Sequence, residues 1–323
     1  MTQWKEIPIT DIRNLRIGHA QNPDAATGCT VLLFGQKAPC GLDVRGGGPA
    51  SRETQLLDPT ASNDGVHAIL LSGGSAYGLD AAGGVMQYLE QHGVGLKVGN
   101  VLVPIVVGSC IFDLGIGRSD VRPDAQMGYE ACVDSEKNRD RCGSVGAGTG
   151  ATVGKLMGAD RAMKSGLGTY AVQVGRLQVG AVVAVNAIGD VFEPDSHRQL
   201  AGLLSKDRTH MISSEEEAIR LLQLKSHFVS NTTIAAIVTN AKLSKAQMKK
   251  VAQLASNGIA RTIRPVNTSM DGDSVYAASC GSVTSNSDVV GTLGAHVLAQ
   301  AIRRAVLETD PGYGLKSAKS FRP

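Results

Sequence analysis

The segment SNTTIAAIVTN, residues 230–240, places an Asn and a hydroxyl residue directly before a run of β-branched and small apolar residues. Such a run predicts a strand, and the polar residues before it favour a turn. The same order of residues is typical of a self-cleaving junction. If the bond between Asn231 and Thr232 breaks, Thr232 gains a free α-amino group of pKa about 7.7–8.0, which can accept the proton of its own hydroxyl. Thr232 is therefore a candidate nucleophile, although a turn that enters a buried strand explains these residues alone more simply.

The composition is that of a soluble globular protein with nearly balanced charge. The chain has 323 residues, of which 42% are hydrophobic, and its net charge is +3. It has no run of Lys or Arg that would follow a phosphate backbone, so we expect no nucleic-acid partner. The most apolar run, residues 101–107, is short and contains Pro104, so we expect no insertion into a membrane. These observations favour a cytoplasmic protein.

Cysteine spacing and glycine content further limit the kind of protein that this sequence can encode. The six cysteines are scattered without a CxxC pair or a closely spaced His, which favours reduced thiols and argues against structural zinc. The 39 glycines indicate many tight connections or close backbone approaches, as in an α/β protein.

Hydrophobic periodicity predicts a mixed α/β architecture. Short β-branched or aliphatic runs predict strands at residues 29–34, 66–71, 170–174, 177–185 and 233–238. Apolar residues at helical spacing predict helices at residues 79–93, 244–258 and 289–307. Gly175 and Arg176 predict a two-residue hairpin, and Ser244 with Gln247 predicts a capping box at the start of the second helix. The polar segment 193–217 is predicted to be a linker upstream of the junction.

Three familiar motifs fail on inspection. The glycine run at 146–155 has the wrong spacing for a phosphate loop, and Leu156 stands where Ser or Thr should bind magnesium. The segment 73–77 lacks the last glycine of a nucleophile elbow, and 270–274 lacks the later ligands of a calcium loop. We therefore expect neither a cofactor nor a metal ion.

Five polar residues remain, each at the boundary of a predicted element. They are Tyr77, Lys155, Asn186, Asp271 and Asp273. The ends of strands in α/β proteins are where ligands and catalytic groups collect. Each residue taken singly is more simply structural, so the functional interpretation depends on their occurrence together with the junction.

Several ordered motifs resemble a known family. They are DVRGGGP at 43–49, LSGGSAYGL at 71–79, GAGTG at 146–150, the segments 186–190 and 231–240, and MDGD at 270–273. Together they resemble the L-aminopeptidase/D-amino-acid esterase (DmpA-type) family of self-processing N-terminal-nucleophile-like hydrolases. That family includes β-peptidyl aminopeptidases and nylon-oligomer endo-hydrolases.

The resemblance implies a fold, a processing event and an activity. The implied fold is an α-β-β-α four-layer sandwich with mixed sheets, as in ornithine acetyltransferases, formed by residues 1–323 as one catalytic domain. Self-cleavage would give an α piece of residues 1–231 and a β piece of residues 232–323. The implied substrates are small peptides, amino-acid amides or esters, and the implied assembly is a homo-oligomer, a tetramer or larger, of cleaved pairs.

The resemblance also implies roles for the site residues. These are the nucleophile Thr232, the oxyanion donor Asn186, the polar partners Lys155 and Tyr77, and the carboxylates Asp271 and Asp273. An ionised Asp273 would hold the threonine amine as an ammonium group, so the identity of the proton acceptor stays open.

Two departures and two alternatives complete the hypothesis. Ser230 stands where some members carry Gly, and Thr232 stands where the aminopeptidase members carry Ser, which resembles the nylon-oligomer branch. An acyltransferase of the ornithine-acetyltransferase type is one alternative, and a non-catalytic binding module on the same scaffold is the other. The sequence leaves open the side-chain preference, the stereochemistry, the choice between α- and β-amides, and the choice between exo and endo cleavage.

Overall fold

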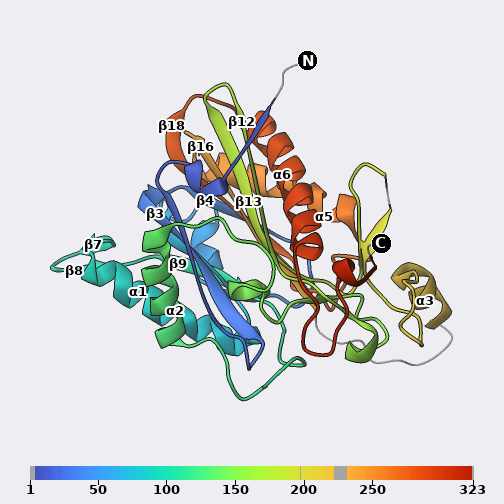
Figure 1. Cartoon of the computed structure of the whole chain (residues 1–323). Coiled ribbons are helices and arrows are strands. Elements are labelled where there is room, and N and C mark those ends of the chain that lie inside the picture. The colour runs from blue at the N-terminus through green and yellow to red at the C-terminus, as the bar shows by residue number, and fades with distance from the viewer. Residues whose placement is uncertain (1–3, 197, 222–230, 322–323) are drawn as a thin grey trace.

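The computed structural model describes residues 4–196, 198–221 and 231–321. Figure 1 shows two large sheets with helices on their outer sides. Within the described residues, no helix is long and apolar enough to cross a membrane.

A six-stranded sheet carries the junction. Its strands in spatial order are β1 (Lys5–Ile7), β12 (Leu167–Val174), β13 (Leu177–Asn186), β16 (Thr232–Ala241), β18 (Ser274–Val283) and β4 (Cys40–Val44). β16 and β18 run parallel, whereas the other neighbours are antiparallel. The sheet is therefore mixed, as predicted.

The second large sheet has five strands. In spatial order they are β2 (Leu15–Asn22), β3 (Thr27–Ala38), β6 (Val66–Ser72), β9 (Val106–Cys110) and β5 (Ala50–Arg52). Three small sheets add β7 (Leu96–Val98) with β8 (Val101–Val103), β10 (Thr152–Val153) with β11 (Met163–Lys164), and β15 (Gln199–Ala201), β14 (Asp190–Phe192) and β17 (Ile263–Arg264).

Six α-helices accompany the sheets within the described residues. They are α1 (Ala81–Gln91), α2 (Ala125–Asp134), α3 (Ser214–Leu221), α4 (Lys245–Ala255), α5 (Asn257–Thr262) and α6 (Ser287–Leu307). α1 and α2 pack on the five-stranded sheet, whereas α4, α5 and α6 pack on the outer face of the six-stranded sheet.

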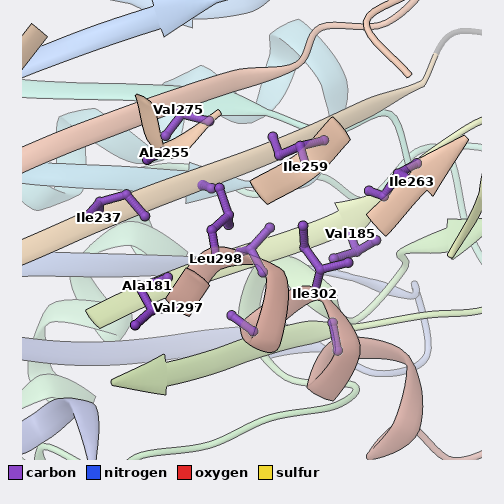
Figure 2. Close-up of a cluster of buried hydrophobic side chains, with 14 of the residues drawn as sticks. Ala181, Val185, Ile237, Ala255, Ile259, Ile263, Val275, Val297, Leu298 and Ile302 are labelled. Carbon is purple, nitrogen blue, oxygen red and sulfur yellow. The ribbon is translucent and has the colours of Figure 1, made fainter. Parts of the chain in front are cut away.

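The alternating direction of side chains along each strand explains how the sheets and helices form separate layers. In β13, Val183 packs against the helices, whereas Val182 and Ala184 pack between the sheets, since successive strand residues point to opposite faces. Figure 2 shows the helix-facing side, where Ile237 of β16 lies in one cluster with Leu298 of α6. Each fully buried aliphatic side chain of this size contributes about 1.5–3 kcal/mol to folding. These clusters form the predicted α-β-β-α sandwich.

The predicted strands and hairpin all occur, and the helices differ from prediction at their ends. The capping box at Ser244 and Gln247 is present, but α4 ends at Ala255 and α5 continues across Gly258, so the predicted stop at that glycine is wrong. A Cβ on Gly258 would lie 2.4 Å from the Ala295 carbonyl oxygen of α6. Gly258 therefore permits close helix packing and does not end a helix.

The predicted linker 193–217 is more structured than expected. It contains β15 and the first turn of α3, and Asp190 holds the residue Leu203 after β15 and the first residue of α3. The Asp190 carboxylate accepts hydrogen bonds from the Leu203 amide at 2.8 Å and from the Ser214 amide and hydroxyl at 2.7 Å. Burial raises the pKa of Asp190 to about 6. The chain upstream of the junction is thus anchored at least as far as α3.

Candidate active site

Strand register brings three residues of the candidate site into one row. Thr232 begins β16 and lies opposite Asn186, the last residue of β13. On the other side, β16 pairs with β18 so that Ile234 faces Ser274, and Asn231 faces Asp271 in the same register. This register places Gly272 beside Thr232. We call Asn186, Thr232 and Gly272 the Thr232 row.

The peptide bond before Thr232 is held by backbone and side-chain contacts. The Asn231 carbonyl oxygen accepts a hydrogen bond from the Gly272 amide at 2.8 Å and one from the Thr232 hydroxyl at 2.5 Å. The Asn231 amide donates to the Met270 carbonyl oxygen at 3.3 Å. Thr232 is only 3% exposed, so the contact between its hydroxyl and this carbonyl is shielded from bulk water. Ser230, on the other side of Asn231, lies outside the described residues.

Position 272 requires a glycine because a Cβ there would lie too close to the Thr232 side chain. A Cβ on Gly272 would lie 2.8 Å from Thr232 Oγ1, closer than real Cβ contacts allow. The sequence interpretation singled out the aspartates on either side and missed this glycine, whose position opposite the nucleophile follows only from the register.

The two aspartates are fixed by backbone amides. Asp273 accepts from the Thr233 amide at 2.6 Å and from the Asn267 amide at 3.0 Å, and Asp271 accepts from the Thr268 amide at 2.7 Å. Burial raises the pKa of both carboxyls, and the negative charge of Asp271 adds to the rise at Asp273. Asp273 therefore carries less negative charge at neutral pH than an exposed aspartate.

The glycine run of the DVRGGGP motif supports this aspartate loop. The Gly48 amide donates to the Asp271 carbonyl oxygen at 2.8 Å, and the Arg45 amide donates to the Asp273 carbonyl oxygen at 3.0 Å. A Cβ on Gly46 would lie 2.2 Å from the Asp271 carbonyl oxygen. Only glycine leaves room for the loop to approach this closely.

The Asn186 side chain is oriented by two neighbours. Its Oδ1 accepts from the Thr152 amide at 3.1 Å, and its Nδ2 donates to the Phe112 carbonyl oxygen at 2.9 Å. A carboxamide nitrogen carries two protons, so one proton remains for an oxyanion. The predicted role of Asn186 as an oxyanion donor is compatible with this orientation and stays a prediction.

Lys155 lies behind Asn186. Its Nζ donates to the Asn186 carbonyl oxygen at 2.8 Å, and the side chain is buried. Burial lowers the pKa of Lys155 to about 7, against the opposite effect of the Asp271, Asp113 and Asp273 charges. The amine therefore changes charge near neutral pH, where an exposed lysine would be fully protonated.

Tyr77 has a different environment from the other predicted site residues. It lies in the 3-10 helix Ser75–Asp80, is 56% exposed, and has the Arg122 guanidinium 3.7 Å from its ring centroid. Among the hydrogen bonds of the described residues, none connects Tyr77 to the Thr232 row, Lys155 or the aspartates. Its predicted role as a polar partner stays a prediction.

Asp113 and Phe112 were missed by the sequence interpretation. Asp113 is buried and accepts from the Thr27 hydroxyl and the Gly74 amide, both at 2.7 Å, and burial raises its pKa. A cavity of about 80 Å³ beside Lys155 is lined in part by Phe112 and Asp113. Both lie two or three residues after the end of β9, so the strand-end criterion could have found them had the sequence predicted β9.

The arrangement has the parts of an acyl-transfer site. A hydroxyl contacts a carbonyl group, a backbone amide donates to the oxygen on which negative charge would develop, and titratable groups surround the row. Within the described ranges, no three His, Cys, Asp or Glu side chains are grouped as a metal site.

The sequence has curated relatives over nearly its whole length. The model of Peptidase family S58 matches residues 8–318. An uncharacterized aminopeptidase of Mycobacterium leprae is 40% identical, over 95% of this chain and 92% of the relative. A 6-aminohexanoate-oligomer endohydrolase of a Kocuria species is 27% identical, over 91% of this chain and 84% of the relative.

Solved structures share the fold. The L-aminopeptidase D-Ala-esterase/amidase of Ochrobactrum anthropi, described as a variant of the Ntn hydrolase fold, has a TM-score of 0.68 at 17% identity. A β-aminopeptidase of a Burkholderia species has a TM-score of 0.65 at 20% identity. Each match covers 94% of this chain and 86% of the other. The predicted N-terminal-nucleophile-like sandwich is thereby confirmed.

Proposed function

From the premise that this chain belongs to peptidase family S58, we propose that it cuts its own backbone before Thr232 and then hydrolyses small amides with that residue as nucleophile. Membership of this family makes the chain an amide hydrolase, as the sequence resemblance predicted. The proposed products of processing are an α piece of residues 1–231 and a β piece of residues 232–323.

The contact between Thr232 and Asn231 carries the proposal. Thr232 Oγ1 lies 2.5 Å from the carbonyl oxygen of the bond to be cut, and the same oxygen accepts the Gly272 amide proton. A buried Ser or Thr commonly bonds to a nearby backbone carbonyl. The second donor on the same oxygen, with two aspartates in the same loop, favours chemistry over that simpler explanation.

Processing and turnover follow the same chemical course. Thr232 Oγ1 attacks the carbonyl carbon, the oxygen–carbon bond forms, and the carbon–nitrogen bond breaks while the hydroxyl proton passes to the leaving nitrogen. Water then hydrolyses the ester, which releases a carboxylate and restores the hydroxyl. In processing the leaving nitrogen is the amine of Thr232 itself, and in turnover it belongs to the substrate.

The raised pKa of Asp273 supports a neutral amine on the processed threonine. A fully ionised carboxylate near that amine would stabilise its ammonium form. Because burial and Asp271 raise the pKa of Asp273, this opposition is weaker at neutral pH. The buried Lys155, with its pKa lowered to about 7, is a second group able to accept a proton there.

Intact-mass measurement of purified protein tests the proposal. We expect the wild type to give two pieces divided before Thr232 and to hydrolyse chromogenic amino-acid amides. Thr232→Ala should remain one piece without turnover, because it has no hydroxyl, whereas Thr232→Ser should retain both reactions. An uncut Thr232→Ala protein that turns over amides at the wild-type rate would reject Thr232 as the nucleophile.

A further inference from the structure

The backbone hydrogen bonds of Asn231 indicate how the acyl residue of a substrate would bind. Asn231 pairs with Asp271 as one more step of the parallel ladder between β16 and β18. Its amide donates to the Met270 carbonyl oxygen, and its carbonyl accepts from the Gly272 amide. After processing, this step of the ladder has lost its covalent link to Thr232.

The chemistry makes Asn231 the first acyl group that Thr232 carries. The ester formed during processing joins the Asn231 acyl group to Thr232 Oγ1. An acyl-enzyme formed from a substrate joins that substrate's acyl residue to the same oxygen. Because the two esters are the same kind of species on the same atom, donors that stabilise one oxyanion are placed to stabilise the other.

Resting on the proposed function, we propose that the ladder position of Asn231 is the acyl-residue subsite, with the Gly272 amide as oxyanion donor and the Met270 carbonyl as acceptor for the substrate's own nitrogen. The Gly272 nitrogen lies 2.8 Å from the Asn231 carbonyl oxygen, which is the atom that becomes the oxyanion when Thr232 attacks the adjacent carbon. Gly272 is thus a catalytic residue through its backbone, in addition to making room for Thr232.

The two hydrogen bonds of the subsite specify an α-aminoacyl group. They are spaced for a nitrogen and a carbonyl separated by one Cα, as in Asn231. A β-aminoacyl group inserts one further carbon, and one more bond of about 1.5 Å, between these two groups. It cannot make both bonds in the ladder geometry. An acyl group without a nitrogen leaves the Met270 carbonyl without this donor.

The position also limits side-chain size. Asn231 is completely buried, so the structure around it encloses a side chain of that size. The subsite therefore fits small acyl residues such as alanine and asparagine.

A panel of p-nitroanilides with processed wild-type protein tests the subsite. The L-alanyl and L-asparaginyl compounds should be hydrolysed with kcat/KM at least about fivefold above those of the 3-aminobutyryl and propionyl compounds, since the loss of one hydrogen bond costs about 1 kcal/mol or more. Equal or faster hydrolysis of the 3-aminobutyryl or propionyl compound overturns the subsite. That result would leave the proposed function standing, because Thr232→Ala tests the nucleophile separately.

Two variants test the oxyanion donor. Glycolic acid in place of Gly272 replaces its amide N–H with an ester oxygen and should slow both processing and turnover by roughly 100-fold. Gly272→Ala should slow both reactions because its Cβ would collide with Thr232 Oγ1. The control is Gly312→Ala, where nothing lies within 4 Å of the added Cβ. A folded glycolate variant with wild-type rates overturns the role of the Gly272 amide, and thermal melting establishes that each variant is folded.

Discussion

Lys155 and Lys164 are both buried lysines, and burial lowers the pKa of each to about 7. Their hydrogen bonds differ. Lys164 Nζ donates to the carbonyl oxygens of Gly148 and Ala151, each at 3.2 Å, and to that of Ser165. Lys155 Nζ has one bond among the hydrogen bonds of the described residues, to the Asn186 carbonyl.

The difference separates a structural lysine from a candidate functional one. An ammonium group has three protons to donate, and Lys164 uses all three to close the glycine-rich turn at 146–151. Lys155 keeps two, and its pKa is affected by Asp271 and Asp273 beside the Thr232 row. Both lysines are thus buried and have a lowered pKa. Only the unused donor protons and the acidic neighbours of Lys155 indicate a role in catalysis.

The largest effect expected from the difference between the two lysines is a loss of activity on substitution of Lys155. Lys155→Met should slow processing and amide turnover by about 100-fold or more, the usual contribution of a positioned proton-transfer group, while the protein stays folded. Intact-mass time courses and a chromogenic amide assay measure the two rates. The matched control is Lys245→Met, which removes a buried lysine that donates to the Leu56, Ala61 and Asn63 carbonyls and lies outside the row. Wild-type rates in Lys155→Met would make both lysines structural.

A smaller effect, on stability, is expected at the other lysine. Lys164→Met leaves three buried carbonyl groups without a donor, and each such loss costs about 1–3 kcal/mol before relaxation. At about pH 10, close to the pKa of an unfolded lysine, we expect the free energy of unfolding to fall by about 2–4 kcal/mol, with turnover per folded molecule within twofold of the wild type. Urea denaturation and the amide assay measure these quantities. Unchanged stability with lost turnover would reverse the assignment of the two lysines.

Local patterns in the sequence were sufficient for some of the elements, whereas others, such as β9, were not predicted. Alternating aliphatic residues predicted β13 and β16, and Ser244 with Gln247 predicted the start of α4, because these signals depend on near neighbours. The pairing of Asn231 with Asp271 joins segments separated by α4 and α5. Single-sequence periodicity carries no information about such pairing. The sequence identified the two aspartates as residues at a strand boundary, and only the family resemblance connected them with Thr232.

Tyr77 and Gly272 show two limits of reasoning from local sequence. Tyr77 follows β6, a strand of the five-stranded sheet, whereas the Thr232 row belongs to the other sheet. A strand end was therefore identified correctly without showing which sheet it joins. Gly272 acts through its backbone amide, which every residue except proline possesses, so residue type could not reveal it.

The last expected effect is a pH dependence that the two lysines share. An unfolded lysine has a pKa of about 10.4, whereas folding lowers the pKa of Lys155 and of Lys164 to about 7. Between these values the unfolded chain binds a proton that the folded chain does not, so the wild type loses stability as pH falls from about 10 to about 7. Below pH 7 both the folded and the unfolded chain are protonated, and the loss of stability is complete.

Relative to the wild type, Lys155→Met and Lys164→Met should each gain stability as the pH falls over this interval, by at most about 1.4 kcal/mol per pH unit. Urea unfolding at pH 7.5, 8.5 and 9.5 measures the gain. A gain for Lys164→Met alone would mean that the acidic neighbours of Lys155 keep it charged, so that it would act as a fixed cation in the site and not as a proton acceptor.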